Sequence, residues 1–557
     1  MFELLLVFTI LLPLFGAFFS FWFRFGLATA ISSSGSLATS IILGISHKIG
    51  TPPITMNLSF INVYMDELSL FFILVVNIVA LFASFYTLQS RKGTSLREDY
   101  SQSKFHLWFN LFHFTMLTVL VMDNLVVLWI AVQLTTVSSA LLVRHSGTRS
   151  AAEAAWKFLI ITTTGVIFAF LGTILLAYAY YATLEDLSKQ KPELLDLRWS
   201  LLAHPGTINQ SNYNILVVSF LLVLIGYGTK AGLAPMHTWL PDGHGEAPAP
   251  VSAMLSGVML KTAFYAILRF FTIAWLNLGE EFILNLLLCS GILSLLIATP
   301  LILKQQYKFK RVLAYHSLEH MGIIAFGVGI GSKVAIFGAL LHALNHALTK
   351  ALMFLVYGHI QDSYHEISHT SAGRSAGRSR YEAGNDKHIR GVWKKMPVVG
   401  TVLTGGGLAL VGAPPFSIFM SEFIILGAAI QKFQDGPPNG PPDLQHWLLV
   451  GAIPLYLLTL TLIFGGLVGH ISRLLFDSTS AGRSVGREGS EFETSRYDVT
   501  SADRLVKVGY ARLRFFSFGS LLLLMLISGL TIIRWPLDLP ELLNESARIV
   551  LEGSQPR

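Results

Sequence analysis

Long apolar stretches recur along this chain and decide what it can fold into. Runs of roughly 18 or more residues with few charges, long enough to be membrane-spanning helices, recur from Leu4 to Leu530 with short polar breaks between them. The 557 residues are 53% hydrophobic and 13% charged, whereas a soluble domain carries roughly 25% charged residues. The sequence therefore predicts an all-α polytopic membrane protein.

Hydropathy predicts about fourteen transmembrane helices of roughly 20 residues each. The first has no basic segment before it and no small-residue cleavage site, so it is expected to be retained as a helix. The expected spans are 2–22, 26–46, 67–88, 105–122, 125–143, 156–181, 213–234, 250–275, 281–303, 311–330, 334–358, 397–430, 447–472 and 515–533.

Basic residues predict which helix ends face the cytoplasm. Most of the 40 Lys and Arg residues lie in connections that follow odd-numbered spans, including 91–104, 304–310, 374–395 and 473–514. Cytoplasmic loops of membrane proteins are enriched in Lys and Arg, so both termini are expected on the non-cytoplasmic side. The net charge of +7 therefore reflects topology, and no nucleic-acid partner is expected.

Two of these loops share a unit rich in Ser, Gly and Arg, at 370–379 and 479–487. Segments with so few apolar residues cannot build a core, so both are expected to be disordered insertions. The single cysteine, Cys289, excludes a disulfide, a cysteine-bound zinc site or an iron–sulfur cluster on this chain. No cofactor is expected, and any electron transfer must take place on another subunit.

Two of the expected spans are interrupted by glycines and prolines. The first interruption follows Lys230 and runs over 232–250, and Lys261 lies in the next span. The second runs from Gly405 through the sequence Gly412-Ala-Pro-Pro-Phe-Ser-Ile-Phe-Met-Ser-Glu422. A pair of broken helices, one in each half, points to a transporter built from inverted repeats with its ion path at the breaks.

Ionisable residues gather between these two breaks. His342, His346 and Lys350 are spaced i, i+4 and i+8, so they share one helix face. His316, Glu319 and His320 begin the preceding span, and Glu422 follows the second break. Charged groups inside a membrane are costly, and histidine titrates near neutral pH, so the set is predicted to relay protons together with Lys230 and Lys261.

Each group also has a plainer interpretation. The histidines have no HExxH arrangement, so no metal site is expected. Lys350 could extend to the membrane surface, and His316 and His320 could be interface residues near Lys308. His237, His244 and Glu246 lie within the first break and either take up protons or pair with backbone. Trp129, Trp156 and Trp239 are expected in the aromatic belts.

Four segments resemble motifs of the antiporter-like membrane subunits of respiratory complex I and its relatives, over residues 105–475. They are Pro235-Met-His-Thr-Trp-Leu-Pro-Asp242 with 246–253, Ala314-Tyr-His-Ser-Leu-Glu-His-Met-Gly322, Leu341-His-Ala-Leu-Asn-His-Ala-Leu-Thr-Lys350, and 414–422. Among these relatives, they are most similar to the antiporter-like component of hydrogenase-4 and formate hydrogenlyase-type complexes.

The resemblance implies two inverted five-helix repeats and redox-driven proton pumping. It implies that helices 1–3 occupy 1–104, the first repeat (helices 4–8) 105–275, and the second repeat (helices 9–13) 276–475 with a low-complexity loop at 361–396. A cytoplasmic loop and helix 14 would occupy 476–557.

The resemblance also assigns residues to roles. It places Lys230 in the broken seventh helix, Lys261 in the eighth, the relay of His342, His346 and Lys350 in the second half, and Glu422 in the broken twelfth. The family keeps a glutamate in the fifth helix where this chain has Gln133. A neutral amide cannot supply the charge that such a glutamate would give its lysine partner, which puts coupling in the first half in question.

The sequence thus predicts a proton-translocating, non-catalytic subunit of a complex I-like or hydrogenase-4-like oxidoreductase in an energy-transducing membrane, such as a bacterial inner membrane. The expected partners are the lipid bilayer, other membrane subunits and a cytoplasmic peripheral arm. Alternatives are a membrane partner of an inorganic-carbon uptake complex, a cation/proton antiporter subunit, or a structural subunit that has lost pumping.

Overall fold

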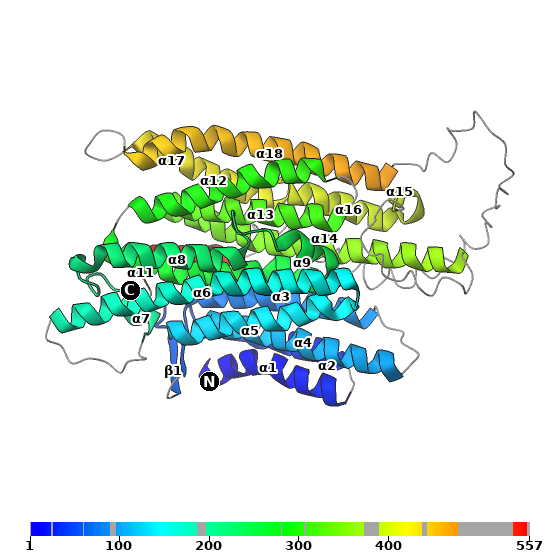
Figure 1. The fold of residues 1–557 in the computed structure, drawn as a ribbon, viewed down its shortest axis with the longest axis horizontal. Helices are drawn as coiled ribbons and strands as arrows, with labels where there is room; N and C mark the ends of the chain where they lie inside the picture. Colours follow the sequence, from blue (N-terminus) through cyan, green and yellow to red (C-terminus); the bar gives the residue numbers. More distant parts are fainter. Residues whose placement is uncertain are drawn as a thin grey trace.

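Long helices that run in nearly one direction make up most of the chain (Figure 1). The computed structural model describes residues 2–23, 26–58, 61–89, 96–186, 197–279, 281–305, 308–371, 389–436, 443–476 and 538–553. The predicted last span, 515–533, and the Ser/Gly/Arg units over 372–379 and 479–487 lie outside these residues. The N-terminal helices form one side of the bundle and the helices over 417–476 form the opposite side, with both chain ends at the same end (Figure 1).

The N-terminal part and the first broken region contain these elements: α1 Phe2–Trp22, α2 Leu27–Ser46, β1 Ile54–Leu58, β2 Ile61–Met65, α3 Glu67–Gln89, α4 Leu96–Val121, α5 Leu125–Val143, η1 Arg144–Ser146, α6 Arg149–Asp186, α7 Trp199–Leu202, η2 Gln210–Asn212, α8 Tyr213–Ala231, α9 Leu240–Glu246 and α10 Ala249–Met254. The strands form an antiparallel hairpin that pairs Ile54 with Met65 and Leu58 with Ile61.

The remaining elements are η3 Leu255–Met259, α11 Leu260–Leu278, α12 Glu281–Lys304, α13 Phe309–Gly329, α14 Lys333–Ser371, α15 Val392–Lys395, α16 Pro397–Leu410, α17 Ser417–Asp435, α18 Leu444–Phe476 and α20 Leu539–Glu552. The segment η3 is one turn of π-helix between α10 and α11. Helix α14 continues well past residue 361, where the sequence predicts a loop.

The chain is a multi-pass membrane protein of the predicted all-helical class. Among the described residues, 10 helices are long and apolar enough to cross a membrane. Helices α4, α13 and the pair α16–α17 also coincide with predicted spans, but they are shorter or more polar.

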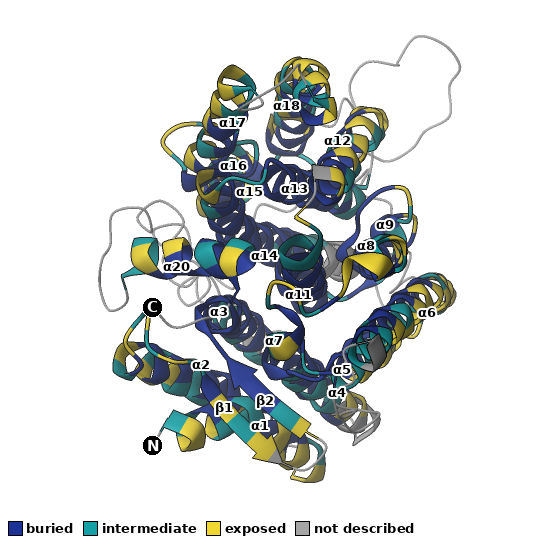
Figure 2. Ribbon diagram, turned by 90° about the vertical axis from the view of Figure 1, so that its left-hand side faces the viewer, coloured by how far each residue is buried: buried dark blue, intermediate teal, exposed yellow. Residues whose placement is uncertain are grey.

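Burial separates an inner from an outer set of helices (Figure 2). The apolar windows of Ala249–Leu278 and Lys333–Tyr364 are fully buried, whereas that of α18 is 28% buried. The outer helices expose large apolar side chains such as Trp156, Ile160 and Leu458, and in a membrane protein such faces meet lipid or other subunits. A charged residue on an inner helix must therefore find its partners within the protein.

Both predicted breaks are present. Helix α8 ends at Gly232, whose φ of 76° suits glycine, and α9 and α10 follow as short segments. The Trp239 indole is fully buried and donates to the Thr229 carbonyl at 2.8 Å, so its assignment to an aromatic belt is wrong. It gives this carbonyl at the helix end a second donor beside the Gly232 N–H, which lies 3.3 Å away. Helix α16 gives way to α17 in the same manner, through Gly412 with φ of 66°.

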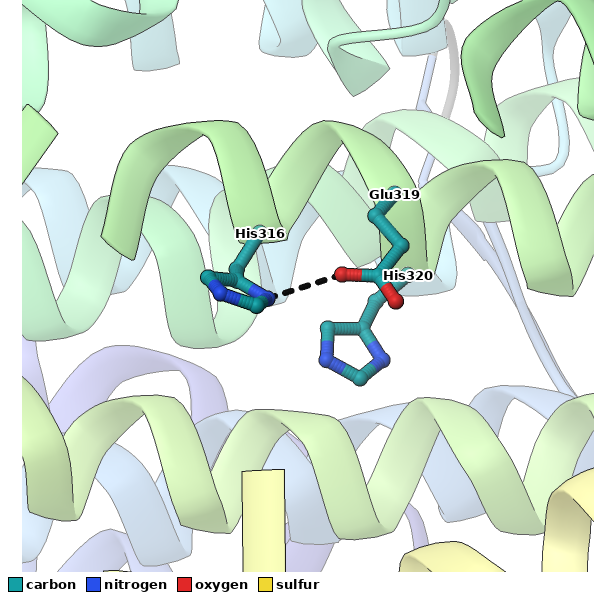
Figure 3. A group of neighbouring side chains, drawn as sticks. All are labelled: His316, Glu319 and His320. Carbon is teal, nitrogen blue, oxygen red and sulfur yellow. Dashed lines mark hydrogen bonds and ion pairs between the residues drawn. The ribbon is translucent and has the colours of Figure 1, made fainter. Parts of the chain in front are cut away.

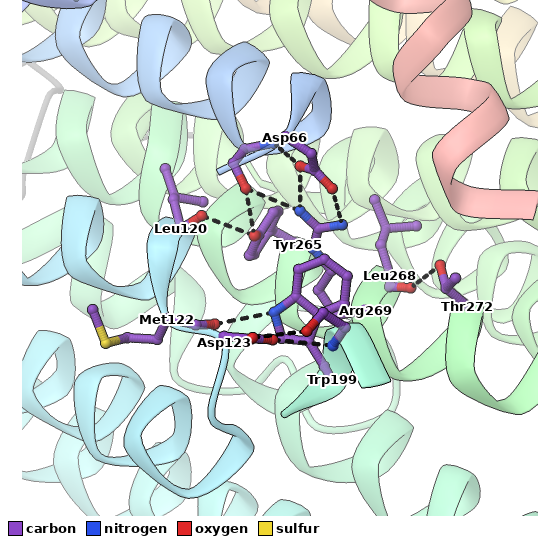
Figure 4. A network of polar contacts seen from close by, with 11 residues as sticks. Asp66, Leu120, Met122, Asp123, Trp199, Tyr265, Leu268, Arg269 and Thr272 are labelled. Atoms are coloured by element: carbon purple, nitrogen blue, oxygen red, sulfur yellow. Dashed lines mark hydrogen bonds and ion pairs between the residues drawn. The ribbon is translucent and has the colours of Figure 1, made fainter. Parts of the chain in front are cut away.

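An ion pair joins α3 to α11 inside the bundle (Figure 4). The Arg269 guanidinium donates to both Asp66 carboxylate oxygens, at 2.8 and 2.6 Å, and lies 3.8 Å over the Trp199 ring. Tyr265 donates to the Leu120 carbonyl at 2.8 Å and so ties α4 into the same network. Sequence inspection finds Arg269 within a span but gives no signal that Asp66 is its partner.

Candidate proton pathway

The densest group of ionisable side chains lies where α13, α14 and α17 meet. His316, His320, His342, His346 and Lys350 have no exposed surface. They occupy one face of α13 and the opposed face of α14, because residues four apart on a helix point the same way. The structure thus brings together residues that the sequence places in two separate spans, and Glu422 from a third span joins them.

The α13 residues pair within their own helix. The His316 Nδ1 atom lies 2.8 Å from a Glu319 carboxylate oxygen, and His320 follows on the same helix (Figure 3). Both histidines are enclosed by protein, unlike residues at a membrane interface. The Glu319 carboxylate also lies within electrostatic range of Lys350 and Glu422, so it faces both sides of the cluster.

Helix α14 supplies the middle of the group. His342 Nε2 lies 2.9 Å from His320 Nδ1, and the His346 ring stacks on His320 at a centroid distance of 4.4 Å. Neither His346 ring nitrogen has a hydrogen-bond partner among the described residues. Lys350 donates to the Leu313 carbonyl on α13. It is buried and therefore does not extend to the membrane surface.

Glu422 ends the row on α17. One donor atom each from His320, His342 and Glu422 lies within 4.8 Å of the others, and the same holds for His316, Glu319 and His320. Such groups can in principle hold a metal ion. In each of them, however, two donors already hydrogen bond to one another. A metal would have to break that bond, so the arrangement suits proton exchange better.

The first half of the chain holds two further buried lysines. The Lys230 ammonium lies 2.5 Å from the Val132 carbonyl and 2.5 Å from the Thr136 hydroxyl, both on α5. Gln133 instead donates to Thr163 on α6 at 3.0 Å. The structure therefore gives Lys230 neutral oxygen acceptors on the helix that carries Gln133, and Thr136 is a contact that sequence inspection missed.

Lys261, in the first half of the chain, is connected by hydrogen bonds to residues of the second half. It donates to the Ser256 carbonyl at 2.7 Å, a group made available within the π-turn η3. The Ser256 hydroxyl lies 2.6 Å from the Ser317 hydroxyl on α13, which donates to Leu313, the same carbonyl that Lys350 contacts. Sequence inspection also missed these two serines, because an isolated serine in an apolar span has no distinguishing pattern.

The three residues predicted to take up protons, His237, His244 and Glu246, have different surroundings in the structure. His244 is fully buried between Trp239 and Phe354, and neither ring nitrogen has a partner among the described residues. His237 is at the edge of the buried region, at 9% exposure. Glu246 accepts from Ser150 at 2.8 Å near the helix ends. Only His244 thus joins the interior group, since it lies within electrostatic range of Lys350 and Lys261.

Comparison with known proteins gives one family match and several similar chains. Residues 122–435 match the family described as "NADH:quinone oxidoreductase/Mrp antiporter, TM". The chain is 35% identical over 373 residues to a hydrogenase-4 component F homolog of Methylacidiphilum infernorum, a match that covers 66% of this chain and 72% of that protein. It is 29% identical over 309 residues to NAD(P)H-quinone oxidoreductase chain 4 of Prochlorococcus marinus subsp. pastoris, over 56% of this chain and half of that protein.

A solved structure shares the fold over almost the whole chain. It belongs to the membrane-bound sulfane sulfur reductase, an archaeal respiratory membrane complex. The TM-score is 0.73 at 22% identity, with 99% of this chain and 98% of that chain covered. At this level of identity the likeness establishes the architecture alone.

Proposed function

The chain belongs to the NADH:quinone oxidoreductase/Mrp antiporter transmembrane family, and we propose from this membership that it translocates protons as a membrane subunit of a multisubunit, redox-driven complex. The observation that carries the proposal is the buried row of titratable groups from Lys230 through Lys261 and the α13–α14 histidines to Glu422. Ionisable groups buried at this depth are costly, so a row of them indicates a function in ion transfer.

The row is suited to protons because nearly every member can gain or lose one. Imidazole both donates and accepts, lysine and glutamate exchange a single proton, and the serines between them can pass one through the hydroxyl. Ring nitrogens without a protein partner, such as those of His346 and His244, are suited to bind water molecules that bridge the gaps. The single cysteine cannot hold an iron–sulfur cluster, so the proposal assigns electron transfer through such clusters to other subunits.

The proposal includes the setting of the protein. The subunit lies in an energy-transducing membrane, such as a bacterial inner membrane, with both termini on the non-cytoplasmic side. Residues 105–275 and 276–475 act as the two repeats, each with one broken helix. Other membrane subunits flank the bundle, and a cytoplasmic peripheral arm supplies the driving reaction. The relatives are named as a component of hydrogenase-4 and a chain of NAD(P)H-quinone oxidoreductase, which supports a place in a multisubunit complex.

The test is reconstitution of the native complex. The complex is purified through a tag on this chain, its other subunits are identified, and it is placed in liposomes that contain a pH-sensitive dye. Turnover with the electron donor and acceptor of those subunits should change the internal pH. A protonophore should abolish that change and a sodium ionophore should not. Turnover without a pH change would contradict the proposal. A requirement for Na⁺ would show that the complex translocates sodium ions in place of protons.

A further inference from the structure

Ser421 occupies a position in the row that neither the sequence motifs nor the comparisons assign. It lies in the second turn of α17, directly before Glu422, and has no exposed surface. Its hydroxyl lies 2.7 Å from the Ile418 carbonyl on its own helix and 3.0 Å from His342 Nδ1 on α14. Ser421 is therefore the only described side chain of α17 with a hydrogen bond to a relay histidine.

The two contacts of this hydroxyl determine where its proton lies. A carbonyl oxygen can only accept, so the contact with Ile418 requires the serine O–H to donate to it. A serine has one such proton. The contact with His342 must then be Nδ1–H donating to the serine oxygen, which makes neutral His342 the Nδ1–H tautomer with a free lone pair on Nε2.

The assignment extends to the next histidine. Because His342 Nε2 is an acceptor, the 2.9 Å contact with His320 requires His320 Nδ1 to donate its proton. The opposite ring nitrogen, His320 Nε2, then carries a lone pair and has no partner among the described residues. The hydrogen bond from His320 to His342 and the one from His342 to Ser421 therefore both have their donor on the His320 side and their acceptor on the α17 side.

We propose, building on the proposed function, that Ser421 is a positioning residue that fixes the tautomer of His342 and so orients the row from His320 to Glu422 for proton delivery. A proton bound at His320 Nε2 makes that ring an imidazolium. His320 then passes its Nδ1 proton to His342 Nε2. His342 releases its Nδ1 proton to the Ser421 oxygen as the serine hydroxyl turns from Ile418 and gives its own proton to the Glu422 carboxylate.

One proton enters and one arrives at Glu422, and no electrons move. Both rings are left as Nε2–H tautomers, so they must return to the starting tautomer before the next proton. The geometry supports Glu422 as the receiver, because its carboxylate lies in the group of donor atoms within 4.8 Å with His320 and His342. Gly412 in the break packs directly against that carboxylate, with no room for a side chain between them.

The first experiment reads the tautomer directly. Histidine is labelled with ¹⁵N in the native complex, and the His342 signals are assigned as those absent in His342→Gln. Wild-type His342 should show a protonated Nδ1 and an unprotonated Nε2. Ser421→Ala should shift the tautomer ratio toward Nε2–H by about fivefold, the equivalent of one net hydrogen bond. Ser421→Thr, which keeps the hydroxyl, should restore the wild-type ratio.

The second experiment measures protons translocated per turnover in liposomes with the same variants. Ser421→Ala should lower the yield at least twofold, and Ser421→Thr should recover it. Ser417→Ala is the matched control, since Ser417 lies one turn earlier on α17 and its buried hydroxyl has no partner among the described residues. It should change neither the tautomer nor the yield.

An Nε2–H tautomer of His342 in the wild type overturns the proposal whatever the complex pumps, as does an unchanged ratio in Ser421→Ala. Wild-type pumping by Ser421→Ala overturns the delivery role. A wild-type complex that turns over without pumping would instead overturn the proposed function, while the NMR result would still decide the tautomer.

Discussion

Lys350 joins the histidine face of α14 to the backbone of α13, and it has no exposed surface. Lys350→Ala should abolish redox-coupled proton transfer, because a hopping chain fails when one member is lost. Assembly should survive, because the packing loses one side chain and the Leu313 carbonyl keeps the Ser317 hydroxyl as a donor at 3.2 Å. Pumping in sealed vesicles and native gels of the complex measure the two effects.

The control for this variant is Lys432→Ala, a change at the partly exposed C-terminal end of α17. It should leave both pumping and assembly intact. Full pumping by Lys350→Ala would show that protons bypass this residue.

Lys230 and Gln133 test whether the first half pumps. Among the described residues, the Lys230 ammonium hydrogen bonds to neutral oxygens on α5, at 2.5 Å each. Without a carboxylate at position 133, Lys230→Ala should reduce translocation much less than Lys350→Ala under one driving force. Gln133→Glu should alter the pH dependence of pumping, since an opposite charge within ~4–6 Å shifts a pKa by about 1–3 units. Equal and complete loss in both alanine variants would show that the first half is obligatory.

At the scale of the secondary-structure elements, the break between α16 and α17 tolerates little added volume. Gly412 has φ of 66°, and a Cβ there would overlap the Glu422 carboxylate. Gly412→Ala should therefore displace Glu422 and strain the backbone by about 1–2 kcal/mol, with a clear loss of pumping. In Gly427→Ala, the matched control within α17, the added carbon meets no heavy atom within 4 Å. Similar pumping by the two variants would contradict this role of the break.

The Asp66–Arg269 pair holds α3 against α11 with no exposed surface on the arginine. Asp66→Asn removes the carboxylate that balances the charge of the buried guanidinium. The free energy of unfolding should therefore fall by about 3–5 kcal/mol. Thermal unfolding of the purified complex measures the loss. Glu153→Gln removes an exposed pair with Lys157 on α6 and should leave the unfolding midpoint unchanged.

The positions of the helices and of the candidate site could be predicted from local sequence, because hydropathy and Gly/Pro interruptions are properties of a single helical segment. The spacing of His342, His346 and Lys350 likewise placed them on one face. Hydrogen bonds and ion pairs between side chains of different helices could not be predicted in this way. Ser421, Ser256 and Asp66 acquire their roles only when distant segments pack together, and a short polar residue next to a helix break leaves no periodic signal.

For the molecule as a whole, the distribution of basic residues predicts the topology. Reporter tags inserted in the loops at 370–380 and 480–490 should be cytoplasmic, and a tag at the C-terminus should be outside. The two chain ends lie at one end of the bundle, in agreement with this arrangement (Figure 1). Protease access to a C-terminal tag from the cytoplasmic face would contradict it.

The packing of α20 has a consequence for biogenesis. This helix contacts α3, α11 and α14, and its Val550 carbonyl accepts from Thr272 at 3.0 Å. It leaves the ribosome after the segments that it covers, although chains generally begin to fold from the N-terminus during synthesis. The described parts of α3, α11 and α14 therefore gain this covering helix only after all three have been synthesised. A nascent chain stalled before Leu539 has every relay residue but lacks this covering, and it is a natural substrate for membrane quality-control proteases.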